Sequence, residues 1–517
     1  MARDYDISTV QQDTFKDTQL AGKDTVEGDA SKDDLPPAGQ RVPRELIHEI
    51  LTSIRPAFDI CSPSVLGASV FTSRQNDFAV YLADMKRFLA LRLISRIWNA
   101  VMIPLIYQEF VIPTRFPVTR PVLYGHIPSV LPTLINSRIT NPYGRVHKLV
   151  SFLRDDDGIV DTLVDNMKTL VLYDFCHPFS SSEYADETQL MTQIIRKFRN
   201  SDIKTLHCYG RETYAFRHPA WLGDTLPNLF STIRNLSFDA VDRKAISNAL
   251  VALGSAIRYL EIRNRSRLWD ADYESLSEAS FHLPSEMPNL EVLRLIHIST
   301  TLSEFTKLLS RVGTLQSPGG ALSSTLQSLV VTQLFVLNED PQVGGFYSPL
   351  TAAEFSRLLD INGIAENLTF LYIGPGLYSM SDAFNVIWRP EIVTEIVRKC
   401  VRLISFSYTS IIDESLVDHL PANLASLALA LRPSLSPPSH ISSYLDALPM
   451  FTDLVRRAVE RGHRLEKLTI LVMDQLQRNP GFWRMSFDEV RDLLQLGRSE
   501  LEETCLEAEV ELAFDLI

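Results

Sequence analysis

The residues from Leu368 to Ile373 read LTFLYI, and this six-residue pattern decides how the 517-residue chain folds. Apolar side chains occupy its first, fourth and sixth positions. Because side chains alternate along a strand, the fourth and sixth residues face one side of a sheet and the fifth faces the other. The pattern occurs ten times, as MKTLVL (167–172), IKTLHC (203–208), IRNLSF (233–238), IRYLEI (257–262), LEVLRL (290–295), LQSLVV (326–331), LTFLYI (368–373), LISFSY (403–408), LASLAL (424–429) and LEKLTI (465–470). One or two copies would be chance in a leucine-rich chain, whereas ten indicate a repeated structural unit.

Helical segments separate several of these copies. TLSEFTKLLSRVG (301–313) and TAAEFSRLLDING (351–363) each begin with a threonine followed three residues later by a glutamate, which is a capping box. Strands that alternate with helices are typically parallel and joined by helical crossovers. Successive copies begin between 21 residues (Leu403 to Leu424) and 42 residues (Leu326 to Leu368) apart. We therefore predict an α/β fold with a curved, irregular leucine-rich-repeat solenoid over residues 140–485.

The two ends of the chain are acidic, and the part between them is neutral. Residues 1–34 hold nine acidic and four basic residues, and residues 486–517 hold ten acidic and two basic residues, so the ends carry −5 and −8 of the formal net charge of −13. We predict a disordered acidic tail over residues 1–38 and an acidic capping helix over residues 486–517. A neutral body lacks the basic face that nucleic acid requires, and no apolar run of eighteen residues predicts a membrane span. We expect neither nucleic acid nor a membrane as a partner.

The five cysteines lie far apart, and no two of them have C-x-x-C spacing. Scattered cysteines favour reduced, packed thiols over disulfides or metal ligands. The first thirty residues contain no apolar segment typical of a secretion signal. These features predict a cytoplasmic and/or nuclear protein.

Two apolar segments precede the repeats: RVPRELIHEILTSI (41–54) and LRLISRIWNAVMIPLIYQEF (91–110). Their apolar residues recur at helical spacing, and Pro43 suits the first turn of a helix. The less regular stretch at about residues 56–84 has the character of an insertion. Both segments carry more apolar residues than short helices can bury against their own neighbours. We therefore predict a docking module for a second protein.

These segments resemble the F-box, and in particular the F-box-like domains of fungal proteins. The family's L-P-x-E-[LI] start is matched by VPREL (42–46), its L-R-x-V-[CS]-[KR]-x-W element by LRLISRIW (91–98), and its P-x-L-Y element by PLIY (104–107). The resemblance covers residues 41–112, and the distance from Pro43 to Trp98 is longer than is usual in the family. An F-box followed by irregular leucine-rich repeats is a familiar pairing, which favours both parts of this reading.

The resemblance implies a three-helix module that binds the Skp adaptor of a cullin-RING ubiquitin ligase, with the repeats holding a protein substrate. The residues that it places at or near the adaptor are Pro43, Leu46, Ile50, Leu91 and Ser95. Burial within the module is the alternative for each of them, and for Ile94 and Trp98 burial is the expectation. The residues expected to bind substrate are Tyr173, Tyr209, Glu261, Arg263, Arg294 and Tyr372 on the face of the strands and Arg265 in the loop after its strand, because tyrosine and arginine often dominate protein recognition. For the arginine-rich segment RYLEIRNRSRLW (258–269) a solvated rim is the alternative.

The sequence contains no motif of a catalytic or nucleotide-binding site. H-E-x-x-H, G-x-S-x-G, the P-loop and G-x-G-x-x-G are all missing, and no histidines or cysteines have metal-ligand spacing. We therefore expect a non-catalytic protein without cofactor or metal. A leucine-rich-repeat scaffold, in which the F-box-like region is only an N-terminal cap, is the main alternative. A hydrolase or transferase with an unfamiliar site is a more distant one.

Overall fold

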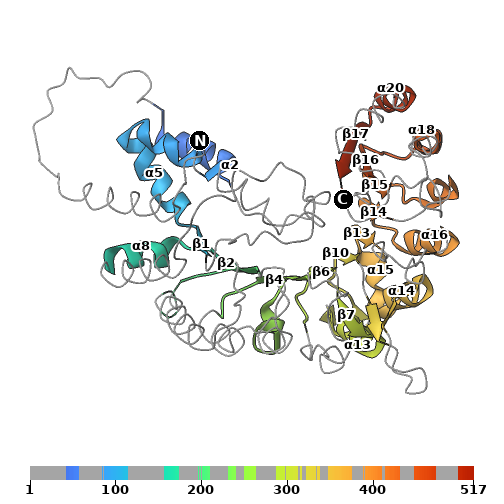
Figure 1. Cartoon of the computed structure of the whole chain (residues 1–517), viewed down its shortest axis with the longest axis horizontal. Coiled ribbons are helices and arrows are strands. Elements are labelled where there is room, and N and C mark those ends of the chain that lie inside the picture. Colours follow the sequence, from blue (N-terminus) through green and yellow to red (C-terminus); the bar gives the residue numbers. More distant parts are fainter. Residues whose placement is uncertain are drawn as a thin grey trace, which may run out of the picture. The chain divides into compact units, whose positions relative to one another are not determined.

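The computed structural model describes residues 42–56, 84–85, 87–113, 157–173, 196, 198, 201–209, 231–239, 250–263, 287–296, 298–312, 315–316, 322–332, 335–337, 347–374, 388, 390–409, 414–430, 448–472 and 499–516 (Figure 1). The chain forms two compact units: unit 1 (residues 1–58, 78–233 and 238–249) and unit 2 (residues 59–77, 234–237 and 250–517). The predicted tail at 1–38 and most of the predicted insertion at 56–84 lie outside the described residues.

In unit 1 a pair of helices leads into three parallel strands. Its elements are α2 (Arg44–Ile54), the short 3-10 helix η2 (Leu91–Leu93), α5 (Arg96–Ile106), β1 (Glu109–Pro113), α8 (Asp157–Asn166), β2 (Thr169–Tyr173) and β3 (Thr205–Tyr209). β1 pairs in parallel with β2, and β2 pairs in parallel with β3. Only Tyr107 and Gln108 separate the last residue of α5 from the first residue of β1. The helix pair is therefore followed directly by a sheet.

In unit 2 eight parallel strands alternate with helices. The strands are β5 (Tyr259–Arg263), β6 (Val292–Ile296), β10 (Ser328–Thr332), β13 (Phe370–Gly374), β14 (Ser405–Tyr408), β15 (Ser426–Ala430), β16 (Lys467–Val472) and β17 (Glu511–Leu516), and they lie side by side in this order. The short helix η3 (Gly254–Ala256) precedes β5, and the helices between the strands are α13 (Leu302–Arg311), α14 (Ala352–Leu359), η5 (Ile361–Gly363), α15 (Ile364–Asn367), α16 (Pro390–Lys399), η7 (Glu414–His419), α18 (Leu448–Glu460) and α20 (Ser499–Glu507). Figure 1 shows the longer helices on one side of these strands.

Further short strands complete the description. β7 (Ser299–Thr301), β11 (Phe335–Leu337) and β12 (Tyr347–Pro349) form a three-stranded sheet, and β8 (Leu315–Gln316) pairs with β9 (Leu322–Ser323). β4 (Asn235–Asp239) contains residues of both units. No helix among the described residues is long and apolar enough to cross a membrane.

Each of the ten motif copies forms a strand, which confirms the predicted α/β fold with parallel strands. The first residue of every copy, from Met167 to Leu465, is buried, and so is the fourth, from Leu170 to Leu468. Burying one such side chain contributes about 1.5–3 kcal/mol. The repeated pattern therefore supplies the core that holds neighbouring repeats together.

One hydrogen-bonding arrangement recurs at the start of the strands. The backbone carbonyl of Gln327 accepts from two amides of the next repeat, those of Thr369 (2.9 Å) and Phe370 (3.1 Å). The carbonyls that accept two amides in this way are those of Gln108, Lys168, Arg234, Arg258, Glu291, Gln327, Thr369, Ile404 and Ala425. At these nine strand starts the shared carbonyl fixes the register of a strand against the one before it.

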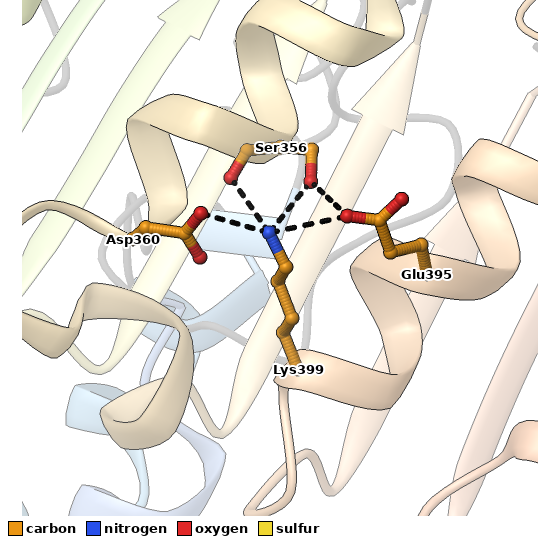
Figure 2. A network of polar contacts seen from close by, with 4 residues as sticks. All are labelled: Ser356, Asp360, Glu395 and Lys399. Carbon is orange, nitrogen blue, oxygen red and sulfur yellow. Dashed lines mark hydrogen bonds and ion pairs between the residues drawn. The ribbon is translucent and has the colours of Figure 1, made fainter.

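Polar contacts join neighbouring helices on the outside of unit 2 (Figure 2). Lys399 of α16 donates to Ser356 Oγ and Asp360 Oδ2, both at 2.9 Å, and forms an ion pair with Glu395 at 3.3 Å. Ser356 in turn donates to Glu395 at 3.1 Å. Burial lowers the pKa of Lys399, but its hydrogen bonds to Asp360 and Glu395 raise that pKa by more, so it lies above the ordinary value of 10.5. The network ties α14 to α16.

The C-terminal segment differs from the single capping helix that the sequence predicts. α20 covers residues 499–507, and the chain then forms β17, which pairs in parallel with β16. Leu512 lies opposite Leu468, and Phe514 lies opposite Ile470. ELAFDL has the alternation of a strand, but the ten acidic residues at this end conceal it in a composition-based reading. Residues 486–498 lie outside the described residues.

Candidate protein-binding surfaces

The helix α2 buries only one narrow side. Pro43 precedes it, and Pro56 restricts Arg55 to an extended backbone that ends it. Ile47 and Leu51 are buried against a core made with Phe88, Val101, Met102 and Leu105. The other apolar residues of the helix face outward: Leu46, Ile50 and Ile54 are 46%, 38% and 51% exposed. Their spacing of four residues places them in one row along the helix.

A second group of exposed aliphatic residues surrounds the start of α5. Ser95 is the N-cap of this helix, and its hydroxyl accepts from the Trp98 amide at 3.3 Å. Leu93 is 79% exposed, and Ile97 is 42% exposed. Ile94 is 57% exposed, so the expectation that it is buried is wrong; it lies in the turn that joins η2 to α5. Trp98, which was expected to be buried, is partly buried against the core of the module.

We call Leu46, Ile50, Ile54, Leu93, Ile94 and Ile97 the N-terminal apolar surface. Eleven large aliphatic residues are exposed in the described part of the chain, and six of them belong to this surface. Such a concentration in α2 and around the start of α5 is typical of a protein-binding site. Ile54, Leu93 and Ile97 were not among the contacts predicted from the sequence, although the four-residue spacing of Leu46, Ile50 and Ile54 could have identified the first.

The five residues predicted to contact an adaptor fall into two groups. Pro43, Leu46 and Ile50 are exposed at the start and along the outer row of α2. Leu91 is partly buried and packs against the core of the module, and Ser95 is partly buried as the cap of α5. Leu91 and Ser95 therefore support the shape of the module, and only the first three present open surface.

Three charged residues that the sequence places on an exposed substrate-binding face are buried. Glu261 forms ion pairs with Arg263 (3.5 Å) and Arg294 (3.6 Å), and it accepts a hydrogen bond from Tyr259 (2.7 Å). Arg294 also lies 5.6 Å from the ring centre of Tyr259. Glu261, Arg263 and Arg294 are at most 5% exposed, so the prediction of an open contact surface at these residues is wrong. The cluster instead joins β5 to β6.

Tyr372 departs from its prediction in the same way. It is 1% exposed and forms a buried apolar cluster with Ile296, Val330 and Phe370. The alternating pattern in the sequence shows which face of a strand is apolar, but it does not show that the opposite face is also buried. Tyr173 and Tyr209 end β2 and β3 as register partners. The side chains of both tyrosines, and the whole of Arg265, lie outside the part of the chain that the structure describes.

The described cysteines are packed as predicted. Cys208, Cys400 and Cys505 are buried free thiols. Burial raises the pKa of all three, to about 12 for Cys400 and about 11 for Cys505, where the nearby Glu502 adds to the effect. Thiols that stay protonated are poor nucleophiles and poor metal ligands. Within the described residues no three histidine, cysteine or acidic side chains are grouped as a metal site. Cys61 and Cys176 lie outside the described residues.

Comparison with known proteins gives little that bears on function. No family model matches the chain, and no curated protein matches it. Among solved structures, the chain is similar to one from the crystal structure of the Rad7 and Elc1 complex in yeast, with a TM-score of 0.34 and 14% sequence identity. The match covers 63% of this chain and 76% of that chain. The function of this protein must therefore be argued from its own residues.

Proposed function

We propose that this chain is a non-catalytic, substrate-recognition subunit of a Skp–cullin–RING ubiquitin ligase. The N-terminal apolar surface binds a Skp-type adaptor and through it a cullin, and the repeats bind a protein substrate. The observation that carries this proposal is the exposure of Leu46 and Ile50 on a helix whose sequence resembles an F-box. The protein itself performs no chemistry, requires no cofactor and acts in the cytoplasm and/or nucleus.

The outer row of α2 is suited to a partner that offers an apolar groove. Side chains four residues apart on a helix are the anchors by which helices bind in such grooves. Leu46, Ile50 and Ile54 supply these anchors, and the backbone of α2 is held in place from below by Ile47 and Leu51. A rigid helix loses little conformational freedom on binding, which favours affinity.

The substrate side of the proposal rests on other residues than those first predicted. Glu261, Arg263, Arg294 and Tyr372 are buried and are no longer proposed as contacts. Tyr173 and Tyr209 remain proposed contacts, because the register of β2 and β3 brings two aromatic residues together at the ends of adjacent strands. Arg265, which follows β5 in the sequence, also remains proposed.

Binding of the full-length chain to a purified Skp-type adaptor tests the proposal directly. We expect the native chain to bind, and we expect Leu46→Ala/Ile50→Ala to bind about 100-fold more weakly, which corresponds to about 2.7 kcal/mol. Isothermal titration calorimetry measures both affinities. The matched control is Val401→Ala/Leu506→Ala, which shortens two exposed aliphatic side chains of unit 2. Equal affinity for all three proteins, or no binding by the native chain, would contradict the proposal.

A second candidate function is that of a leucine-rich-repeat scaffold whose N-terminal helices only cap the first strands. The observation that favours it is the direct connection of α5 to β1, which makes the helices continuous with the sheet of unit 1. Deletion of residues 41–106, which leaves Gln108 and β1 in place beside β2, distinguishes the two functions. The scaffold reading predicts that β2 and β3 lose hydrogen-exchange protection, whereas the adaptor reading predicts loss of adaptor binding with protected strands.

A further inference from the structure

Arg55 contacts three elements of unit 1 at once. Its backbone ends α2 with an extended conformation (ψ 123°). Its guanidinium donates to the carbonyl of Leu105 in the last turn of α5 at 3.2 Å and to the side-chain oxygen of Gln108. It also forms an ion pair with Glu109, the first residue of β1, at 3.8 Å. The Arg55 side chain is 14% exposed and that of Glu109 is 4% exposed, so solvent screens these contacts little.

The chemistry of the helix end explains why an arginine fits here. The last carbonyls of a helix have no partner within it, and the negative end of the helix dipole favours a cation. The Tyr107 amide bonds to Ile103 at 3.2 Å, and Arg55 bonds to Leu105. A guanidinium offers five donors in a planar fork, so it can serve several acceptors, whereas a lysine presents a single ammonium.

Gln108 connects this contact to the sheet. Its side chain accepts from Arg55, while its backbone carbonyl accepts from the amides of Lys168 (2.8 Å) and Thr169 (2.9 Å) at the start of β2. This is the first of the shared carbonyls that set the register of the repeats. Gln108 therefore contacts the end of α2 through its side chain and the start of β2 through its backbone carbonyl.

We infer that Arg55 is a positioning residue that locks α2 in one orientation against α5, β1 and β2. Ile47 and Leu51 provide the adhesion of α2 to the module, but packing in a narrow apolar stripe permits a helix to roll or slide. The directional hydrogen bonds from Arg55 to Leu105 and Gln108, together with the ion pair to Glu109, remove that freedom at the end of the helix. This inference concerns orientation only and holds whatever protein binds the outer row of α2.

Distance measurements between two spin labels on the full-length chain test the inference. Labels introduced as noncanonical amino acids at Glu49 of α2 and Asp165 of α8 occupy exposed positions of unit 1 and leave the native cysteines unchanged. We expect one narrow distance distribution in the native chain, a broad one in Arg55→Ala and an intermediate one in Arg55→Lys. The matched control is Arg44→Ala, which removes an exposed arginine at the other end of α2 and should keep the narrow distribution.

Hydrogen exchange of the α2 amides separates orientation from folding. We expect Arg55→Ala to keep this protection within about threefold of the native value while the distance distribution broadens. Gln108→Leu provides a second variant that leaves α2 untouched and should broaden the distribution to a smaller extent. A narrow distribution in Arg55→Ala overturns the inference. So does loss of α2 protection in Arg55→Ala combined with a narrow distribution in Gln108→Leu, since Arg55 would then be needed for folding alone.

Discussion

Helix α2 in unit 1 has 11 residues and helix α14 in unit 2 has 8, and the two differ in how many of their apolar residues are buried. In α14 the residues Ala352, Phe355, Leu358 and Leu359 are all buried, and its outward side presents Arg357. In α2 two apolar residues are buried and three are exposed. The apolar residues of α14 are thus covered by neighbouring residues, whereas α2 has an apolar side that no described residue covers.

The two helices also differ in how their ends are secured. α14 begins with a complete capping box, in which Thr351 accepts from the Glu354 amide and Glu354 accepts from the Thr351 amide. α2 follows Pro43 and has no side-chain cap at its start. At the far end of α2, Ser53 donates to the Ile50 carbonyl within the helix (2.7 Å), and Arg55 bonds to other elements of unit 1. The start of α14 is therefore capped by residues of its own first turn, whereas α2 is held by contacts to other elements of unit 1 while its apolar side stays exposed.

The largest effect should distinguish the two sides of α2. Leu51→Ala removes a fully buried side chain and should lower the free energy of unfolding by about 2–5 kcal/mol. Leu46→Ala removes the same atoms from an exposed position and should change it by less than about 0.5 kcal/mol. Hydrogen exchange of the α2 amides measures both values. Similar losses in the two variants would mean that Leu46 is covered, which would remove the contrast between α2 and α14.

A smaller effect concerns the cap of α14. Thr351→Ala removes the hydroxyl that accepts from the Glu354 amide and should lower the free energy of unfolding by about 1 kcal/mol. Urea denaturation followed by circular dichroism measures the change. Thr351→Ser keeps the hydroxyl and is the control, with an expected stability close to that of the native chain. If alanine and serine behave alike, α14 depends on packing alone and resembles α2 more closely than its contacts indicate.

The smallest effect concerns the network that ties α14 to α16. Lys399→Met should lower the free energy of unfolding by about 0.2–1 kcal/mol near pH 7, since both of its ion-pair partners, Asp360 and Glu395, are exposed. The pKa of Lys399 is raised on folding, so its contribution is complete below the ordinary pKa of 10.5 and is lost as the pH rises through the folded value. Urea denaturation at pH 8 and pH 11 should show the two proteins converging at the higher pH. A difference that is independent of pH would assign the loss to packing of the lysine stem.

The strands could be predicted from the sequence because each depends on a local pattern. The six-residue pattern L-x-x-L-x-L indicates which side chains face the core, and all ten copies form strands. The capping box of Thr351 and Glu354 was predictable for the same reason. The row of Leu46 and Ile50 could also be located, because helical spacing together with the F-box resemblance placed both at an outer surface.

What could not be predicted depends on contacts between distant residues. Glu261 and Arg294 are 33 positions apart in sequence but lie opposite each other in β5 and β6, and their pairing permits burial that composition argues against. The exposure of Ile94 depends on a turn between two helices rather than on spacing. The strand β17 was hidden because its acidic flanks resemble a solvated helix, while its partner β16 lies more than forty residues earlier.

The shared carbonyls at the strand starts have a consequence for how the segments between strands can change during evolution. At nine strand starts a single acceptor and the two amides that meet it hold the same alignment, although the connecting segments differ in length. Doubling the length of a connection costs only about 0.6 kcal/mol in chain entropy. Connections between strands can therefore change in length at little cost in chain entropy while the strands remain aligned, provided that their helices keep the apolar residues that are buried in the core.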